Sequence, residues 1–265
     1  MSNIAIVDGD VLAYMSCPPR LQVHGGHYQV SKETKPSDII FTPEDDAKYL
    51  EICWKNFKIK LNDIIELCWA DFALCGVKDE FYPDFRSVMY PDYKITASRN
   101  PAKKNKAVPE IRLRAISEGL AIPASNREAD DLMRIWSEEA RKAGDTYTVC
   151  SIDKDLKCIP GRHYLMNKDT FFEISEEDAH RFHYEQLLKG DPTDKVPGIP
   201  KVGDVGAHAI ISEFETEEGM RECVLSMYKN SYGEYWREYL LSNGKMLYLQ
   251  KHPNDYFSLA GWDLT

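Results

Sequence analysis

The sequence contains no long hydrophobic run and no closely spaced cysteine pair. No apolar stretch approaches the roughly 20 residues that a membrane-spanning helix needs, so no membrane partner is expected. The first residues, MSNIAIVDGD, lack the basic and then apolar layout of a secretory signal. The seven cysteines include no CxxC pair, which indicates neither a zinc site nor a disulfide framework. We therefore expect reduced thiols in a cytoplasmic compartment.

The chain also lacks an excess of positive charge. Its 265 residues carry a formal net charge of −10, which taken alone argues against a nucleic-acid partner. The basic residues are concentrated, however, between residues 94 and 114, where Glu110 is the one acid among them. They are Lys94, Arg99, Lys103, Lys104, Lys106, Arg112 and Arg114. A local patch of this kind suits phosphate contact, and an ordinary solvated loop is the alternative.

The pattern of apolar residues predicts strands that alternate with helices. Strands are expected at 3–7, 146–152 and 163–174, and 64–75 is interpreted as a strand region. Helices are expected at 43–63, 109–119 and 128–143, whereas 79–107 is expected to be irregular. Beyond about residue 176 the pattern becomes helical. The alternation predicts an α/β fold with a central, mostly parallel sheet flanked by helices.

Acidic side chains follow two of these strands and begin one helix. Asp8 follows the first strand, SIDKDL (151–156) places Asp153 and Asp155 after another, and READD (127–131) contributes Glu128, Asp130 and Asp131. Because ligands of open α/β sheets bind beyond the carboxyl ends of the strands, we expect these groups to converge. On a helix, Glu128 and Asp131 are i,i+3 neighbours, with Asp130 offset from them. Each motif alone also fits a turn, a cap or an ordinary helix start.

Carboxylates gathered in one place repel each other unless cations lie among them. Hard oxygen ligands without His or Cys favour Mg²⁺ over zinc, with Mn²⁺ as a substitute. Two such ions can clamp the attacking water and the leaving oxygen of a phosphodiester. The acidic motifs thus predict a two-metal phosphodiesterase site.

A segment rich in glycine and proline follows at 190–211, GDPTDKVPGIPKVGDVGAHAII. It places Asp191 and Asp194 before a turn and an Ala-rich helical run. Glycines such as Gly198 and Gly203 would let the backbone approach a phosphate, and the next helix would offer free N–H groups. The segment predicts a helix–hairpin–helix unit that grips duplex backbone without reading bases. A structural turn between two helices is the alternative.

Read together, READD, SIDKDL and GDPTDKVPGIPKVG (190–203) resemble the motifs of the 5′-nuclease superfamily of PIN-like flap endonucleases and 5′–3′ exonucleases. The chain is most similar to the small bacteriophage exonucleases of T5 and T7 type and to the exonuclease domain of bacterial DNA polymerase I. The resemblance implies a catalytic domain at 1–175 with a clamp or arch at 80–112. It implies a helical DNA-binding region at 176–265 that packs back on the first domain. The implied activity is metal-dependent hydrolysis of DNA near 5′ ends, in phage or bacterial replication or repair.

The resemblance also assigns roles to residues. It places Asp8, Glu128 and Asp130 at a first metal, with Asp131 shared or adjacent, and Asp153, Asp155, Asp191 and Asp194 at a second. Asp8, Asp130 and Asp153 would be catalytic together with Lys94 and Arg99, which would act on the scissile phosphate. Tyr93 would stack on the terminal base. The implied DNA-contacting residues are Arg86, Tyr93, Lys94, Arg99, Lys103, Lys104, Lys106, Gly198, Lys201 and Gly203.

The same resemblance implies ligands and partners. A K⁺ ion is expected at the hairpin, 198–206. The expected partner is duplex DNA with a 5′ end, nick, gap or flap, or an RNA–DNA hybrid, bound by a monomer in the cytoplasm, which is the host cytoplasm if a phage encodes the chain.

The sequence departs from the family pattern at two places. The Asp expected after the second strand is missing at ALCGVKDE (73–80), where Cys75 or Gly76 takes its place, and we expect Asp79 to substitute. Asp204 follows the hairpin, where an acid would weaken phosphate binding.

Two other functions fit parts of the sequence. VDGDV (7–11) resembles the DxD motif of haloacid-dehalogenase-type phosphatases, with Asp8 as nucleophile and Asp10 as acid/base. That interpretation leaves READD, SIDKDL and the hairpin unexplained. A non-catalytic DNA-binding scaffold that has lost a metal ligand is the other alternative, because of the missing Asp near residue 76.

Overall fold

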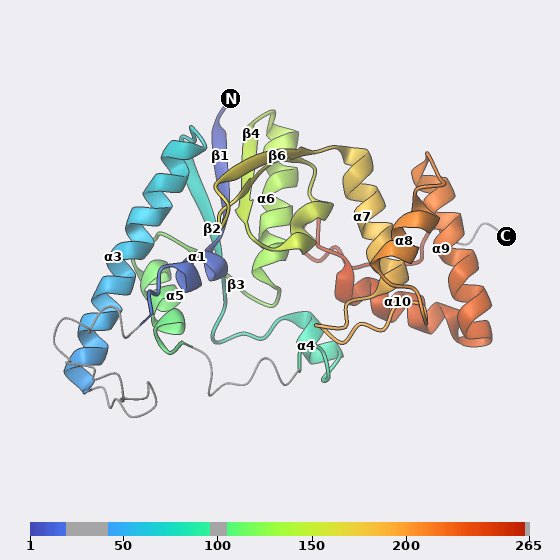
Figure 1. The fold of residues 1–265 in the computed structure, drawn as a ribbon, viewed down its shortest axis with the longest axis horizontal. Coiled ribbons are helices and arrows are strands. Elements are labelled where there is room, and N and C mark those ends of the chain that lie inside the picture. The colour runs from blue at the N-terminus through green and yellow to red at the C-terminus, as the bar shows by residue number, and fades with distance from the viewer. Residues whose placement is uncertain (20–41, 96–104, 263–265) are drawn as a thin grey trace, which may run out of the picture.

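The computed structural model describes residues 1–19, 42–95 and 105–262, and its central feature is a six-stranded sheet (Figure 1). The strand order is β3-β2-β1-β4-β5-β6. Every pairing is parallel except that of β6 with β5, which is antiparallel. The strands are β1 Asn3–Asp8, β2 Phe72–Lys78, β3 Ile122–Ala124, β4 Thr146–Ser151, β5 Gly161–Leu165 and β6 Thr170–Ile174. The mostly parallel α/β fold predicted from the sequence is thereby confirmed.

Helices cover both faces of the sheet. One face carries α1 (Gly9–Met15), α3 (Pro43–Leu67) and α5 (Ala107–Ser117), and the other carries α6 (Ala129–Ala143) (Figure 1). The first strand shows why both faces are filled. Ala5 and Val7 point into the core under α3 and α5, whereas Ile4 and Ile6 point into the core under α6. A strand buried on both faces has the continuous apolar run seen in the sequence.

A short 3-10 turn, η4 (Lys154–Cys158), lies between β4 and β5. After β6 the chain continues as a helical region. Its elements are α7 (Glu176–Lys189), α8 (Asp204–Ile211), α9 (Glu217–Tyr232), a 3-10 turn η5 (Gly233–Tyr235) and α10 (Trp236–Leu247). These helices gather on the side of the molecule that also holds the C-terminal end (Figure 1). None of the described helices is long and apolar enough to cross a membrane.

The C-terminal helices have a hydrophobic cluster of their own, drawn from residues 184–262. A smaller cluster of Tyr93, Val196 and Met246 joins this region to the rest of the molecule. The predicted division into 1–175 and 176–265 stays a prediction, which the separate clusters support. The predicted clamp or arch at 80–112 lies partly outside the described residues.

One local expectation was wrong, and two short elements were not foreseen. Residues 64–67 continue α3 instead of starting a strand, because Ile64 belongs to the same buried stripe as Trp54, Phe57 and Leu61. A short helix, α4 (Phe85–Met89), forms within the segment expected to be irregular, and Asp84 caps it by accepting from the Ser87 N–H. The three-residue strand β3 carried too little pattern to be predicted.

The segment between α7 and α8 folds into a tight loop. The backbones of Asp191 and Val196 exchange two hydrogen bonds, of 2.9 and 2.8 Å. Gly198 has a positive φ of +61°, and a Cβ on it would lie 2.3 Å from the backbone nitrogen of Gly190. Gly203 differs, because nothing lies within 4 Å of the position of its missing Cβ. The absence of a side chain at Gly198 therefore serves close packing of the chain on itself.

This contrast gives a stability prediction. We expect Gly198→Ala to lower the free energy of unfolding by about 2–4 kcal/mol, since it adds both a clash and a strained φ. Gly203→Ala is the matched control and should change it by less than about 1 kcal/mol. Urea unfolding of the two variants measures the difference, and equal midpoints would contradict the close-packing role of Gly198.

Candidate functional site: a carboxylate cluster at the edge of the sheet

Asp8 is the last residue of β1, and each oxygen of its carboxylate accepts a hydrogen bond. One oxygen accepts from the Val11 N–H (3.0 Å) and the other from the Ser151 hydroxyl (2.6 Å). The same Ser151 oxygen accepts the backbone N–H of Asp153 at 3.0 Å. Ser151 thus links the carboxyl ends of β1 and β4. Its role was not foreseen from the sequence, although SIDKDL places a hydroxyl two residues before the acid.

Burial raises the pKa of Asp8 to about 6, in spite of the hydrogen bonds from Ser151 and Val11. Repulsion from Asp10 and Asp153 acts in the same direction. Burial, followed by repulsion from Asp8 and Asp153, raises the pKa of Asp130 well above its ordinary value. Asp8, Asp130 and Asp153 therefore lie within electrostatic range of each other, at the edge where the ends of β1 and β4 meet the start of α6.

Asp155, Asp191 and Asp194 form the neighbouring part of the cluster. Burial raises the pKa of Asp155 to about 6, and repulsion from Asp153, Asp191 and Asp194 adds to the effect. Asp155 also accepts from the Gln186 amide at 2.9 Å. Asp191 accepts from the N–H groups of Thr193 (2.7 Å) and Asp194 (3.3 Å), so it also holds the loop that carries Asp194. The structure thus brings the four predicted second-site acids together.

Lys94 lies between the two groups of acids. Its ammonium pairs with Glu128 and lies 3.5 Å from Asp194. Burial lowers the pKa of Lys94, but the combined attraction of Glu128, Tyr93, Asp194 and Asp130 outweighs burial and raises the pKa well above the ordinary value. Burial likewise opposes ionisation of Glu128, yet Lys94 and Arg86 lower the pKa of that carboxyl. The pair is charged, and Lys94 lies at the site as predicted.

The donors fit a divalent cation in kind. They are carboxylate oxygens, which hard cations prefer. Burial, and then repulsion between the acids, raises the pKa values of Asp8, Asp130 and Asp155, and a bound cation would oppose both effects. Across residues 1–19, 42–95 and 105–262, however, no three Asp, Glu, His or Cys side chains stand in position to hold an ion between them. The chemistry of the site therefore fits a metal, whereas the side chains as placed do not close around one.

Two predicted site residues have other partners. Asp131, expected at the first metal, is fully buried and forms a two-bond ion pair with Arg86, at 2.6 and 2.9 Å. Arg86, expected to contact DNA, is 0% exposed and does not reach the surface. We therefore withdraw the predicted metal role of Asp131 and the predicted DNA contact of Arg86.

Two further side chains are placed differently from expectation. Tyr93 was expected to stack on a base, but it is only 5% exposed and its hydroxyl donates to Glu128 at 3.0 Å. Asp79 was expected to replace the missing metal ligand. It accepts instead from the Ser125 hydroxyl and from the N–H groups of Phe81 and Tyr82, so it orders the loop after β2.

The position opposite Asp8 in β2 is Gly76. Next to it, Asp10 is neutralised by Arg112, with 2.7 Å between their charged atoms, and it also accepts the Lys78 N–H. The structure therefore supplies no substitute for the missing acid at this strand end within the described residues.

The predicted DNA-contacting residues are spread over several segments. Lys106, Lys201 and Gly203 are exposed, whereas Gly198 is buried against Gly190 and does not offer its backbone to a phosphate. Arg99, Lys103 and Lys104 lie outside the described residues. Asp204, at the start of α8, is held by Lys189 at 2.6 Å.

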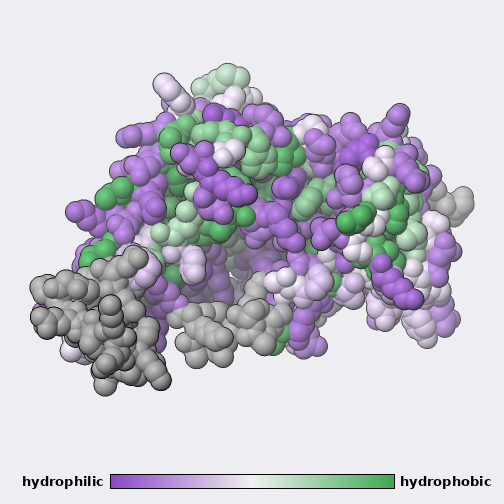
Figure 2. Space-filling view, viewed as in Figure 1, coloured by the Kyte–Doolittle hydropathy of each residue, from purple (hydrophilic) through white to green (hydrophobic). Residues whose placement is uncertain are grey.

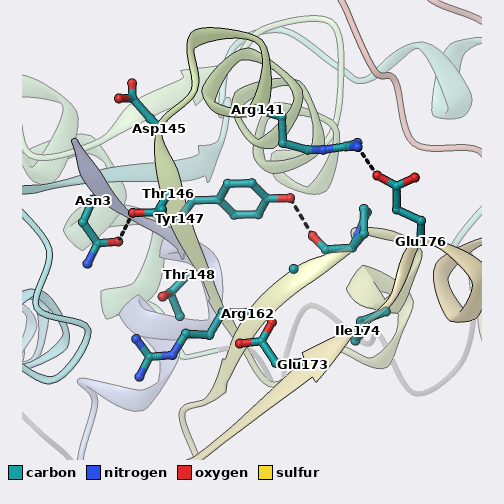
Figure 3. A pocket seen from close by; sticks show the side chains of 12 residues that line it. Asn3, Arg141, Asp145, Thr146, Tyr147, Thr148, Arg162, Glu173, Ile174 and Glu176 are labelled. Carbon is teal, nitrogen blue, oxygen red and sulfur yellow. Dashed lines mark hydrogen bonds and ion pairs between the residues drawn. The ribbon is translucent and has the colours of Figure 1, made fainter. Parts of the chain in front are cut away.

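A pocket of about 590 Å³ lies at the opposite end of the sheet, where β1 and β4 begin (Figure 3). Two of its polar groups already have partners, because Arg141 pairs with Glu176 and the Tyr147 hydroxyl donates to the Pro160 carbonyl (Figure 3). The face of the molecule seen in Figure 2 is mostly hydrophilic, with hydrophobic residues in separate patches. The carboxylate edge therefore remains the strongest candidate for a functional site.

The chain was compared with known proteins, and no family model matches it. DNA polymerase I of Borreliella burgdorferi is 31% identical over 159 residues, which cover 54% of this chain and 17% of that protein. DNA polymerase I of Bacillus caldotenax is 28% identical over 183 residues, covering 63% of this chain and 20% of that protein. The chain thus spans about a fifth of the length of these relatives.

Two solved structures share the architecture. A bacteriophage T5 protein co-crystallised with metal ions has a TM-score of 0.62 at 16% identity, over 94% of this chain and 89% of that chain. A T5 flap endonuclease in a pseudo-enzyme–product complex with DNA and metal ions has a TM-score of 0.52 at 13% identity, over 92% of this chain and 99% of that chain. The fold is that of the phage T5 5′-exonuclease. The resemblance inferred from the motifs is therefore confirmed.

The electrostatics of the carboxylate cluster give a pH prediction. When folding raises the pKa of a carboxyl, the folded protein is more stable at a pH below the unfolded pKa. That stability is lost as the pH rises from the unfolded pKa through the folded pKa. For Asp155 that window runs from about 4 to about 6. In EDTA, Asp155→Asn should therefore stabilise the protein by about 2 kcal/mol at pH 8 and by only a few tenths at pH 4. Urea unfolding at both pH values measures this, with the exposed Asp63→Asn as control. A gain that is equal at both pH values would contradict the account.

Proposed function

We propose that this protein is a divalent-metal-dependent 5′-nuclease that hydrolyses phosphodiester bonds of DNA near 5′ ends. The observation that carries the proposal is the convergence of Asp8, Asp130 and Asp153 at the carboxyl edge of the sheet, with two of the three pKa values raised by burial and mutual repulsion. The T5-like fold and the similarity to DNA polymerase I support it. A role in phage or bacterial DNA replication or repair follows from the same similarity.

The metal would be Mg²⁺, with Mn²⁺ as a substitute. Asp8, Glu128 and Asp130 would hold one ion, and Asp153, Asp155, Asp191 and Asp194 a second. Such ions supply a water of lowered pKa and neutralise charge on the phosphate. The donor chemistry supports this assignment, and Asp131 is left out because Arg86 and backbone N–H groups occupy both its oxygens.

The chain's own groups would orient the reaction. Ser151 fixes Asp8 and the backbone of Asp153 relative to each other. Lys94 lies beside Glu128 and Asp194, which belong to the two groups of acids, and it would contact the scissile phosphate, with Arg99 assisting. The exposed Lys106, Lys201 and Gly203 would contact the DNA backbone without reading bases.

The finer statements about ligands are also proposals. The substrate would be a duplex with a 5′ end, nick, gap or flap, or an RNA–DNA hybrid, bound by a cytoplasmic monomer. K⁺ would bind at 198–206, where one backbone oxygen, that of Gly198, already accepts from the Tyr232 hydroxyl.

The phosphatase alternative is less well supported, because Asp10 is tied to Arg112 and is not available as an acid/base. The scaffold alternative rests on Gly76, which stands where an acid was expected. Cleavage assays on 5′-labelled flap, nicked duplex and RNA–DNA hybrid, with Mg²⁺ and with EDTA, separate the three functions. We expect Mg²⁺-dependent release of short products that carry 5′-phosphates. DNA binding without turnover would favour the scaffold, and hydrolysis of a small phosphate ester alone would favour the phosphatase.

Asp153 offers the sharpest single-residue prediction. Asp153→Ala should lower the cleavage rate by about a thousandfold or more and leave duplex affinity within about threefold, because phosphate contacts elsewhere carry the affinity. Asp63→Ala, in an exposed part of α3, is the control and should keep wild-type rates. Rates come from single-turnover cleavage and affinities from fluorescence anisotropy in Ca²⁺. Undiminished cleavage by Asp153→Ala would refute its assignment to the site.

A further inference from the structure

We propose that Arg86 is a positioning residue for the metal site and that the C-terminal segment 246–250 supports Glu128 through it. The inference rests on the proposed function, since it takes Glu128 as a metal ligand. The buried cation Arg86 and the segment 246–250, which is far from the acidic motifs in the sequence, would both support the metal ligands.

The guanidinium of Arg86 joins three separate parts of the chain. From α4 it donates two hydrogen bonds to Asp131 at the start of α6. It also donates from Nε to the Met246 carbonyl (3.1 Å) and from Nη2 to the Tyr248 carbonyl (2.6 Å). Its Nη1 lies 3.4 Å from Oε2 of Glu128. Arg86 therefore uses the full fork of its guanidinium inside the protein, which a lysine cannot reproduce.

Asp131 completes the connection to Glu128. One of its oxygens accepts the Glu128 backbone N–H at 3.0 Å, and the other accepts the Gln250 backbone N–H at 3.1 Å. Glu128 precedes the first turn of α6, with an extended backbone (φ −88°, ψ 160°), so the helix itself does not fix its direction. Its backbone is thus held by Asp131, and its side chain by Arg86 and Lys94.

The energetics make this arrangement sensitive to substitution. Burial lowers the pKa of Arg86, but the charge and hydrogen bonds of Asp131, together with the charge of Glu128, outweigh burial and raise the pKa, so the pair is ionised. A buried carboxylate that loses its cation is strongly destabilised and rearranges. Groups that orient metal ligands in this way commonly contribute about tenfold to about a hundredfold to metal affinity.

Binding of Mn²⁺, measured by the EPR signal of the free ion, tests the proposal without relying on activity. Arg86→Lys should weaken Mn²⁺ binding by about tenfold or more. The matched control is Arg134→Lys. Arg134 is a buried arginine on α6, the helix that also carries Asp131, and it bonds to the Cys158 carbonyl and to Glu138 but to none of the proposed ligands. We expect wild-type Mn²⁺ binding in that variant. Asp131→Asn, which keeps the shape of the side chain, is the second variant if Arg86→Lys does not fold.

The outcomes are distinguishable. Weaker Mn²⁺ binding in Arg86→Lys or Asp131→Asn, with Arg134→Lys unchanged, supports the positioning role. Unchanged binding in the folded Arg86 or Asp131 variants overturns it, and so does an equal loss in Arg134→Lys, which would indicate general destabilisation. If the wild-type protein itself binds no Mn²⁺, that result contradicts the proposed metal-dependent function and, with it, the positioning role.

Discussion

The constraint on which the structure depends is the crowding of like charges at one edge of a parallel sheet. Because β1 and β4 run in the same direction, Asp8 and Asp153 must emerge side by side, and the start of α6 adds Asp130 to them. Burial denies these carboxylates the solvation that would otherwise make such proximity tolerable. Burial raises the pKa of Asp8 to about 6, which is consistent with that cost. A fold that keeps this arrangement requires positive charge nearby.

Two cationic side chains of the protein supply part of this positive charge, and they lie in different surroundings. Arg86 is fully buried and commits its guanidinium to Asp131, Met246 and Tyr248, so its charge serves the framework. Lys94 is partly exposed and pairs with Glu128 at the rim, where a phosphate can also arrive. Neither lies among Asp8, Asp130 and Asp153 as a direct ion-pair partner. That unmet part of the charge is the reason to assign a divalent metal to the edge.

The convergence of acids at this edge was predictable from the sequence, because an acid directly after a buried strand lies at the carboxyl edge of a parallel sheet. The Arg86–Asp131 pair was not. The i,i+3 spacing suggested that Glu128 and Asp131 share a helix face, but Glu128 stands before the helix with an extended backbone, and a buried arginine from α4 contacts both carboxylates. Tyr93 and Arg86 were expected at the DNA because of the resemblance to the 5′-nuclease superfamily. Spacing along the chain does not show that Met246, at the end of α10, packs against both Arg86 and Tyr93 and buries them. Gly198 was misjudged for a similar reason, since its close neighbour is Gly190 and not a ligand.

The most direct test of the account is a crystal structure of the protein grown with Mn²⁺, with the ions located by anomalous scattering. The account predicts one ion bound by Asp8, Glu128 and Asp130 and a second by Asp153, Asp155, Asp191 and Asp194, with Arg86 still bonded to Asp131. Anomalous peaks elsewhere, or no ion at this edge while Lys94 stays paired with Glu128, would contradict it.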